Sequence, residues 1–261
     1  MTQDSHLPRA GARIAYRLSG SGSPLAYAHG ILLSRAAVRR LELFDFDRLA
    51  AEHHLLTYDQ RGHGHSAGRP VAEDYRFENI AQDLLALMDE ISFTEPLDMV
   101  GSSLGCAAAL YAALAAPDRF RRLVLMIPPA AWDDGLAARQ WYLDTADQID
   151  TLGAPAWLEH WEAADPLPIF ADHPQFHFTP DVPNELLAPA LRGAGSSDLP
   201  PQPDVARLPH RTLILTWDTD PLHPTSTAQR LAELLPNSSL HVAKSVDDIR
   251  TWTTMVAEFC R

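Results

Sequence analysis

Short apolar runs alternate along the chain with longer segments in which apolar residues recur every three or four positions. A run of four to eight apolar residues is typical of a buried strand, and strict alternation is typical of a half-buried one. These patterns predict strands at 11–18, 24–28, 54–58, 96–100, 120–127, 211–216 and 239–243. Helical spacing predicts helices at 34–51, 77–91, 103–116, 226–235 and 246–259. The repeated order of strand and helix predicts an α/β fold with a mostly parallel central sheet flanked by helices.

Residues 129–207 break this order. They carry tryptophan, proline and histidine in irregular order and show helical pieces but no clear strand pattern. We therefore expect a helical cap at 129–207, inserted over one end of the sheet, and a core formed by 1–128 and 208–261. The proline-rich stretch 199–203 would return the chain to that core.

The charge of the chain narrows the range of partners. Among 261 residues, 34 are acidic and 21 basic, which gives a formal net charge of -13. Such a surface repels phosphate backbones and anionic lipid, so neither nucleic acid nor a membrane is an expected partner. A homodimer is left open, and the expected ligand is a small molecule.

Cysteine content and the chain terminus bear on location. Cys106 and Cys260 are the two cysteines, and neither their number nor their spacing suggests a disulfide framework or a metal cage. Residues 1–9 are polar and lack the apolar stretch of a signal peptide. No apolar run approaches the length of a membrane span. We expect a cytoplasmic protein that needs no metal or redox cofactor.

One pentapeptide carries candidate chemistry. Residues 101–105 read Gly-Ser-Ser-Leu-Gly, which places Ser103 at the centre of a Gly-x-Ser-x-Gly motif between a predicted strand and a predicted helix. In this setting the serine sits on a sharp turn, and the two glycines let strand and helix approach closely. The amino terminus of the following helix adds positive potential near the hydroxyl. Ser103 is therefore the candidate nucleophile.

Three further motifs surround this pentapeptide in a fixed order. His-Gly at 29–30 follows an early strand, Asp-Gln-Arg-Gly-His-Gly-His-Ser at 59–66 follows the next, and Trp-Asp-Thr-Asp-Pro-Leu-His-Pro at 217–224 follows a late strand. With these motifs the chain resembles the α/β-hydrolase superfamily over residues 11–260. The resemblance implies that Ser103 attacks a carbonyl carbon. It also implies that the backbone N–H groups of Ile31 and Leu104 stabilise the resulting oxyanion.

The resemblance also implies an acid on the loop at 217–224. Asp220 is our first choice, because Asp-Pro-x-x-Pro at this point fits the superfamily loop best. Asp218 on the same loop is the competing acid, and Asp133, after the strand at 120–127, is a third candidate. The acid would orient and charge-balance an imidazole.

The superfamily's catalytic histidine usually lies on a loop after the last strand, and this chain has none there. Ser245 and Asp248 instead form a helix N-cap signal, so the final helix should begin almost at once. His223, three residues after the preferred acid, is our first choice for the base. His241 lies within a predicted strand, and His29 more naturally supports the oxyanion loop by hydrogen bonding.

The sequence thus predicts a serine hydrolase that cleaves a carboxylic ester or similar activated carbonyl through an acyl-enzyme on Ser103. Its substrate should be small to medium in size and mostly apolar. A serine without a base is a poor nucleophile. If no histidine serves, the alternatives are a cofactor-independent lyase or cyclase on the same fold, or a ligand-binding protein with impaired catalysis.

Overall fold

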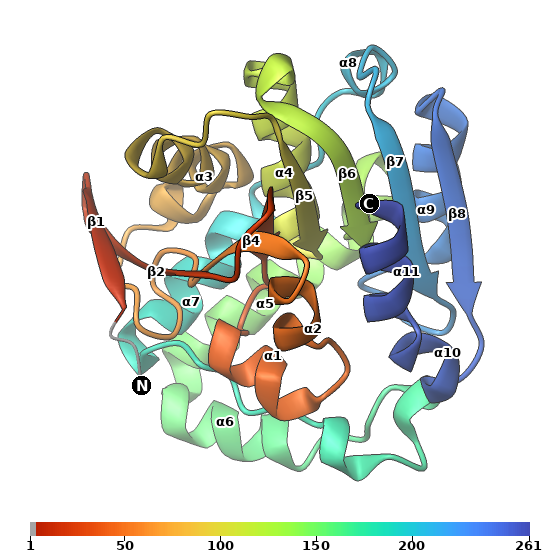
Figure 1. The fold of residues 1–261 in the computed structure, drawn as a ribbon. Helices are drawn as coiled ribbons and strands as arrows, with labels where there is room; N and C mark the ends of the chain where they lie inside the picture. Colours follow the sequence, from red (N-terminus) through yellow and green to blue (C-terminus); the bar gives the residue numbers. More distant parts are fainter. Residues whose placement is uncertain (1–3) are drawn as a thin grey trace.

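The computed structural model describes residues 4–261 and shows one central sheet with helices on both faces (Figure 1). The strands are β1 (Ser5–Arg9), β2 (Ala12–Ser19), β3 (Ser23–Ala28), β4 (His53–Tyr58), β5 (Leu97–Ser102), β6 (Phe120–Met126), β7 (Arg211–Trp217) and β8 (Ser238–Ala243). Their order across the sheet is β1-β2-β4-β3-β5-β6-β7-β8. β2 pairs antiparallel with β1 and with β4, and all remaining neighbours are parallel. The predicted mostly parallel sheet is confirmed.

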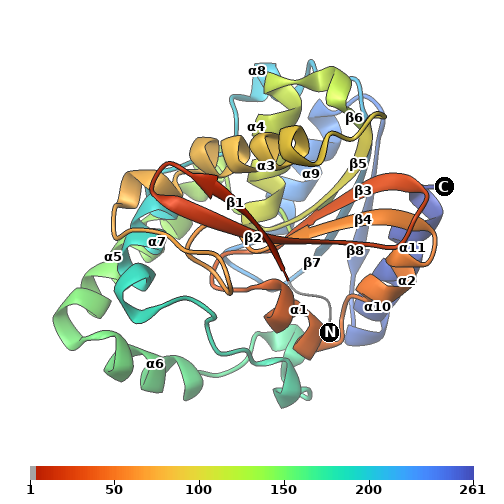
Figure 2. The same ribbon diagram turned by 60° about the vertical axis from the view of Figure 1, so that its left-hand side comes forward.

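Two layers of helices bury the sheet from either side (Figures 1 and 2). One face is covered by α3 (Phe77–Ile91), α4 (Leu104–Ala115) and α9 (Thr225–Leu234). The opposite face is covered by α1 (Arg35–Leu41), α2 (Phe46–Ala50), α10 (Val246–Arg250) and α11 (Trp252–Phe259). Because both faces are covered, the central strand β5 is buried at every position, which explains why its sequence does not alternate.

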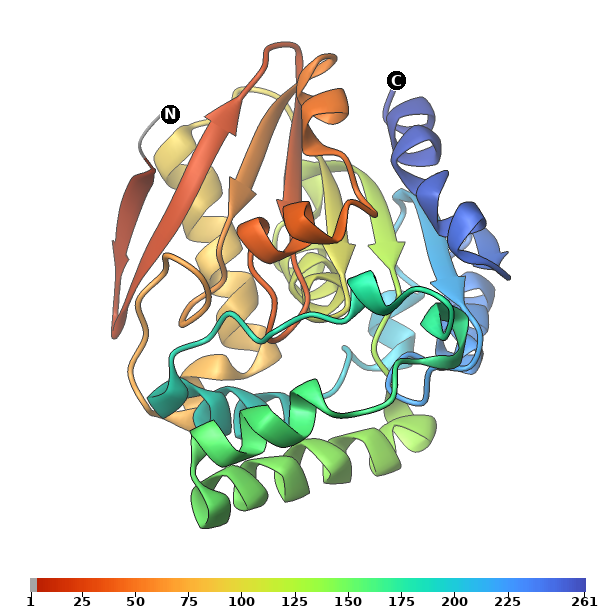
Figure 3. The ribbon, with the colours of Figure 1, turned by 90° about the horizontal axis from the view of Figure 1, so that it is seen from below.

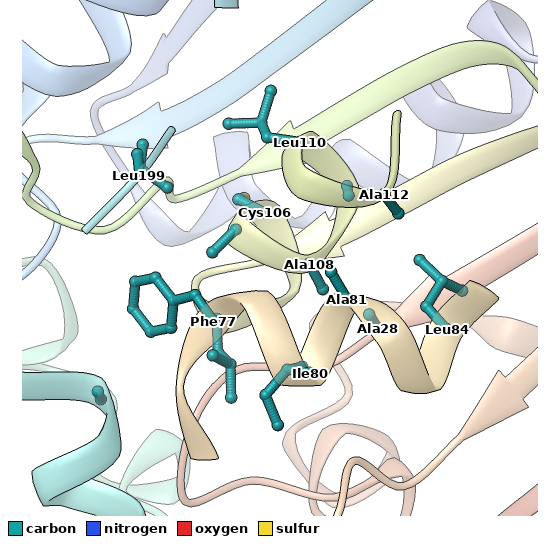
Figure 4. Packing of buried hydrophobic residues seen from close by; sticks show 14 of the residues in the cluster. Ala28, Phe77, Ile80, Ala81, Leu84, Cys106, Ala108, Leu110, Ala112 and Leu199 are labelled. Carbon is teal, nitrogen blue, oxygen red and sulfur yellow. The ribbon is translucent and has the colours of Figure 1, made fainter. Parts of the chain in front are cut away.

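Small side chains let α4 pack closely in this arrangement. Its buried residues include Cys106 and a series of alanines, and α3 buries Ile80 and Leu84 in the same apolar cluster. Figure 4 shows side chains of both helices from this cluster, among them Cys106, Ala108, Ile80 and Leu84, with Leu199 from the chain before β7 nearby. Alanine and cysteine bring α4 close to the sheet, and this fixes the position of the turn that precedes the helix.

The chain between β6 and β7 lies across the end of the sheet to which the parallel strands point (Figures 1 and 3). There it forms α5 (Leu136–Leu152), α6 (Ala154–Glu162) and α7 (Asn184–Gly195), whereas α8 (Gln202–Val205) lies at the opposite end of the sheet, before β7 begins (Figure 1). Single 3₁₀ turns occur at Ala72–Tyr75, Pro117–Arg119, Trp132–Gly135, Pro168–Phe170 and Pro174–Phe176. The division into a core and a cap at 129–207 stays a prediction. None of the helices in residues 4–261 combines the length and apolar character needed to cross a bilayer.

Some elements differ from the sequence-based expectation. β1 has no predicted counterpart, because its residues do not alternate clearly. The helix expected at 34–51 is two helices, because Glu42 takes the left-handed φ of 53° that ends α1 and Asp45 caps the start of α2. The helix expected at 246–259 also divides, at Thr251. It begins where expected, since the Ser245 side chain accepts a hydrogen bond from the backbone N–H of Asp248.

Candidate active site

Ser103 occupies the sharp turn between β5 and α4. Its backbone has φ 51° and ψ −112°, a conformation that a residue with a side chain keeps only when its surroundings hold it. A β-carbon on Gly101 would collide with the backbone of Gly105, and one on Gly105 would collide with the carbonyl of Ala28. Both glycines are needed for this close approach, as the motif predicts.

The Ser103 hydroxyl lies 2.7 Å from Nε2 of His223. On the other side of the ring, Nδ1 of His223 lies 2.8 Å from Oδ2 of Asp220. A carboxylate can only accept, so Nδ1 carries the proton and the Nε2 lone pair is free to accept from the serine hydroxyl. The structure thus brings the three side chains chosen from the sequence into one hydrogen-bonded line.

A tight turn fixes the imidazole relative to the carboxylate. The His223 N–H donates to the Asp220 carbonyl at 3.2 Å, and the Leu222 N–H donates to Asp220 Oδ1 at 2.9 Å. Pro221 suits the second position of such a turn because its ring holds φ near −65°, and aspartate suits the first. The Ala130 N–H donates to the Leu222 carbonyl at 2.8 Å, so the turn is also tied to the chain that follows β6.

The Asp220 carboxylate remains ionised despite its burial. Burial alone would raise its pKa, but the electrostatic attraction and hydrogen bond of the His223 ring, together with the backbone N–H of Leu222, outweigh burial and lower the pKa. Asp220 is 5% exposed, so its negative charge acts on the imidazole with little screening by water.

The amides expected to bind an oxyanion belong to the residue after Ser103 and to a loop that passes beside it. A β-carbon on Gly30 would lie 3.2 Å from the β-carbon of Ser103, so the backbone leading to Ile31 passes directly beside the serine. Leu104 is the first residue of α4, and its N–H therefore precedes the hydrogen-bond ladder of the helix.

His29 supports the loop that carries Ile31. Its Nε2 accepts from the backbone N–H of Gln60 at 2.9 Å, so its Nδ1 carries the proton and donates to the Gly30 carbonyl at 2.8 Å. Burial lowers the pKa of this fully buried imidazole and keeps it neutral. With both ring nitrogens occupied, His29 holds the backbone in place, as the sequence suggested.

The remaining candidates lie elsewhere. His241 is exposed on β8, and Asp133 is exposed in the 3₁₀ turn Trp132–Gly135. Asp218 forms a 2.6 Å ion pair with Lys244 at the surface. Within the described chain, no hydrogen bond or ion pair joins these three side chains to Ser103.

The motif at 59–66 holds loops together. Asp59 accepts from the backbone N–H and the guanidinium of Arg35, both at 2.9 Å. Arg61 binds both carboxylate oxygens of Asp83, at 2.7 and 2.8 Å. The Ser66 hydroxyl donates to the Asp59 carbonyl at 2.6 Å. These buried bonds make the motif structural.

Ser103 is 4% exposed and the His223 side chain 14%, so the site is largely closed. Tyr142 of α5 lies near Asp220. Burial raises the pKa of its phenol, and the negative charge of Asp220 raises it further. Sequence reasoning missed Tyr142, because no motif surrounds it.

Surface grooves of about 310 and 420 Å³ lie elsewhere, beside Arg230 and beside His210. Among residues 4–261, no three His, Cys, Asp or Glu side chains gather as metal ligands.

Comparisons with known proteins bear on the fold of the whole chain. The family model for the alpha/beta hydrolase fold matches residues 24–166, more than half of the chain. The 2-hydroxymuconate semialdehyde hydrolase of Pseudomonas sp. (strain CF600) is 29% identical over 89% of this chain and 83% of its own. A putative carbamate hydrolase RutD of Variovorax paradoxus is 30% identical over 74% of this chain and 73% of its own. The thermophilic esterase of Thermogutta terrifontis superposes with a TM-score of 0.78 at 22% identity, over 99% and 98% of the two chains.

Proposed function

Because the chain belongs to the α/β hydrolase fold family, we propose that it is a serine hydrolase that cleaves carboxylic esters or similar activated carbonyl compounds through an acyl-enzyme. One observation carries the proposal: His223 lies 2.7 Å from the Ser103 hydroxyl and 2.8 Å from the Asp220 carboxylate. This line of three groups supports nucleophilic catalysis, and it supplies the base that the loop after β8 lacks.

In the acylation step, Ser103 Oγ attacks the carbonyl carbon while Nε2 of His223 takes the hydroxyl proton. The N–H groups of Ile31 and Leu104 stabilise the negative oxygen of the tetrahedral intermediate, and loss of one such donor typically costs about 3–4 kcal/mol of barrier. The carbon–oxygen bond to the leaving alkoxide then breaks, and the imidazolium returns its proton to that oxygen. Asp220 stabilises the imidazolium throughout.

Deacylation repeats the same steps with water. Nε2 of His223 takes a proton from a water molecule whose oxygen attacks the acyl carbon. When the tetrahedral intermediate collapses, the bond to Ser103 Oγ breaks and the serine recovers its proton from the imidazolium. The products are a carboxylic acid and an alcohol, and the protein returns to its starting state.

The substrate in this proposal is small, apolar and uncharged. In residues 4–261, the buried arginines are Arg35 and Arg61, and each is already paired, with Asp59 at 2.9 Å and with Asp83 at 2.7 Å. An anionic group in the closed site would therefore find no free buried guanidinium, and an unpaired buried charge is costly. The helices at 129–207 act as the cap that admits and then encloses the substrate.

A fluorophosphonate probe tests the proposal, because it labels only an activated serine. We expect labelling of the parent protein, none in Ser103→Ala, and labelling slowed by about 10⁴-fold or more in His223→Ala. His241→Ala removes an exposed histidine and serves as the matched control, with labelling unchanged. An unlabelled parent protein would contradict the proposal and favour a ligand-binding protein.

Carbamate cleavage is a second candidate. It is supported by the 30% identity to a relative described as a putative carbamate hydrolase. The same residues would act, but the carbonyl carbon under attack would be bonded to nitrogen as well as to the alkoxy oxygen. Turnover of alkyl esters, measured as acid release, and turnover of matched alkyl carbamates, measured as ammonia release, decide between the two substrate classes.

A further inference from the structure

The loop that carries the Ile31 amide contains a strained turn. The Leu33 N–H donates to the Gly30 carbonyl at 3.3 Å, which closes a turn with Ile31 and Leu32 at its centre. Leu32 has φ 64° and is 3% exposed. Leucine rarely takes this left-handed conformation, where glycine is usual, so surrounding contacts must hold it.

Those contacts come from a residue distant in sequence. Asp181 lies on the chain between β6 and β7, and its backbone N–H donates to the Leu32 carbonyl at 2.8 Å. Its own carbonyl accepts from the Gly64 N–H at 2.8 Å, and its carboxylate accepts from the Ser34 hydroxyl. Ser34 also accepts from the Ala37 N–H at 3.0 Å, and so caps α1 directly after the turn.

We propose that Asp181 is a positioning residue that holds the Ile31 amide in place for the oxyanion, through Leu32 on one side and Ser34 on the other. The inference rests on the proposed serine hydrolysis. It gives the segment between β6 and β7 an indirect part in catalysis besides covering the site. Its effect should appear in the transition state, where the oxyanion carries charge, and little in ground-state binding.

Side-chain substitutions isolate the carboxylate, because the two backbone hydrogen bonds of Asp181 remain in every variant except proline. Asp181→Ala removes the acceptor for the Ser34 hydroxyl, whereas Asp181→Asn keeps an oxygen that can accept the same bond. We expect kcat of Asp181→Ala to fall by about tenfold or more, within the about 10²–10³-fold that a complete oxyanion donor supplies. KM should change by less than about threefold, and Asp181→Asn should restore most of the lost kcat.

A tetrahedral inhibitor gives a readout that a loss of stability would not move. A trifluoromethyl ketone that forms a hemiketal with Ser103 should bind Asp181→Ala more weakly by the same factor as kcat falls. Arg40→Gln is the matched control, because Arg40 lies 3.8 Å from the same carboxylate at the surface, and its kcat should not change.

The outcomes separate this inference from the proposed function. A parent protein that does not react with fluorophosphonate defeats the proposed function itself. An active parent whose Asp181→Ala variant keeps its kcat and its affinity for the ketone defeats only the positioning role. Equal losses in Asp181→Asn and Asp181→Ala would also overturn it, because the hydrogen bond to Ser34 would then not be the cause.

Discussion

Asp220 and His223 lie three residues apart on one turn, whereas the resemblance to the superfamily implies a histidine on a separate loop after the last strand. Their relative position therefore depends on Pro221 and Leu222 more than on the packing of one loop against another. The same turn explains how the protein places an imidazole beside Ser103 although α10 begins directly after β8.

Replacing the acid should preserve the fold of this turn and remove its chemistry. Asp220→Asn keeps an oxygen for the Leu222 N–H, but it withdraws the charge that orients and stabilises the imidazole. We expect kcat for an activated ester to fall by about 10⁴-fold. Asp218→Asn, on the same loop but paired with Lys244 at the surface, should stay within about twofold. Similar losses in the two variants would mean that the acid has been misassigned.

The buried His63 should make the protein less stable in acid. Burial lowers the pKa of its imidazole to about 3, against about 6.5 in the unfolded chain. Between these values the unfolded state binds more protons, so stability is complete above about pH 6.5 and falls as the pH drops toward 3. The expected slope is up to about 1.4 kcal/mol per pH unit.

Urea unfolding of His63→Asn between pH 4 and 7.5 measures this contribution. Asparagine does not titrate, so the free energy of unfolding should depend less steeply on pH than in the parent protein, whatever its absolute value. His241→Asn, at an exposed position, should keep the parent slope. An unchanged slope in His63→Asn would assign the acid sensitivity to other groups, such as His29, whose pKa burial also lowers.

At the scale of elements, the sequence predicted those strands and helix ends whose signals lie within a few neighbouring residues. Apolar runs located the parallel strands, and Ser245 marked the start of the last helices. Glu42 ends α1 in a left-handed conformation. Because no glycine stands at this position, the sequence predicts one continuous helix at 34–51 where the structure has two. Tyr142 and Asp181 approach the site only through the packing of α5 and the chain after α6, which no local pattern encodes.

The N-cap of α10 offers a test of whether the segment after β8 has any catalytic part. Ser245→Ala removes the hydroxyl that accepts from the Asp248 N–H, which should cost about 1 kcal/mol of stability. Because the proposed base is His223, kcat should be unchanged at a temperature where the variant is folded. A loss of kcat without a loss of stability would assign a catalytic role to the loop after β8. Thermal unfolding and ester turnover on one sample give both quantities.

At the scale of the whole molecule, the sheet supplies the serine and the turn, and the chain between β6 and β7 closes the site from the carboxyl ends of the strands (Figure 3). Ala130 ties this chain to the turn at Leu222, and Asp181 ties it to the loop at Leu32. In the proposed function, a substrate reaches Ser103, which is 4% exposed, past this part of the chain. The net charge of -13 acts on any charged substrate before that step.

That charge predicts how salt will affect substrates of different sign. A negative surface slows the approach of an anionic ester and speeds that of a cationic one. Raising the ionic strength from about 10 to 150 mM shortens the screening length from about 30 to 8 Å, and so weakens both effects. For three esters of equal size that differ only in a terminal group, we expect kcat/KM to rise with salt for the carboxylate and fall for the ammonium. It should stay constant for the neutral ester, which should exceed the carboxylate at every salt concentration, because the buried arginines Arg35 and Arg61 are already paired. If the carboxylate became the preferred substrate at high salt, a cation inside the site would have to be available to it, and the uncharged substrate class would be wrong.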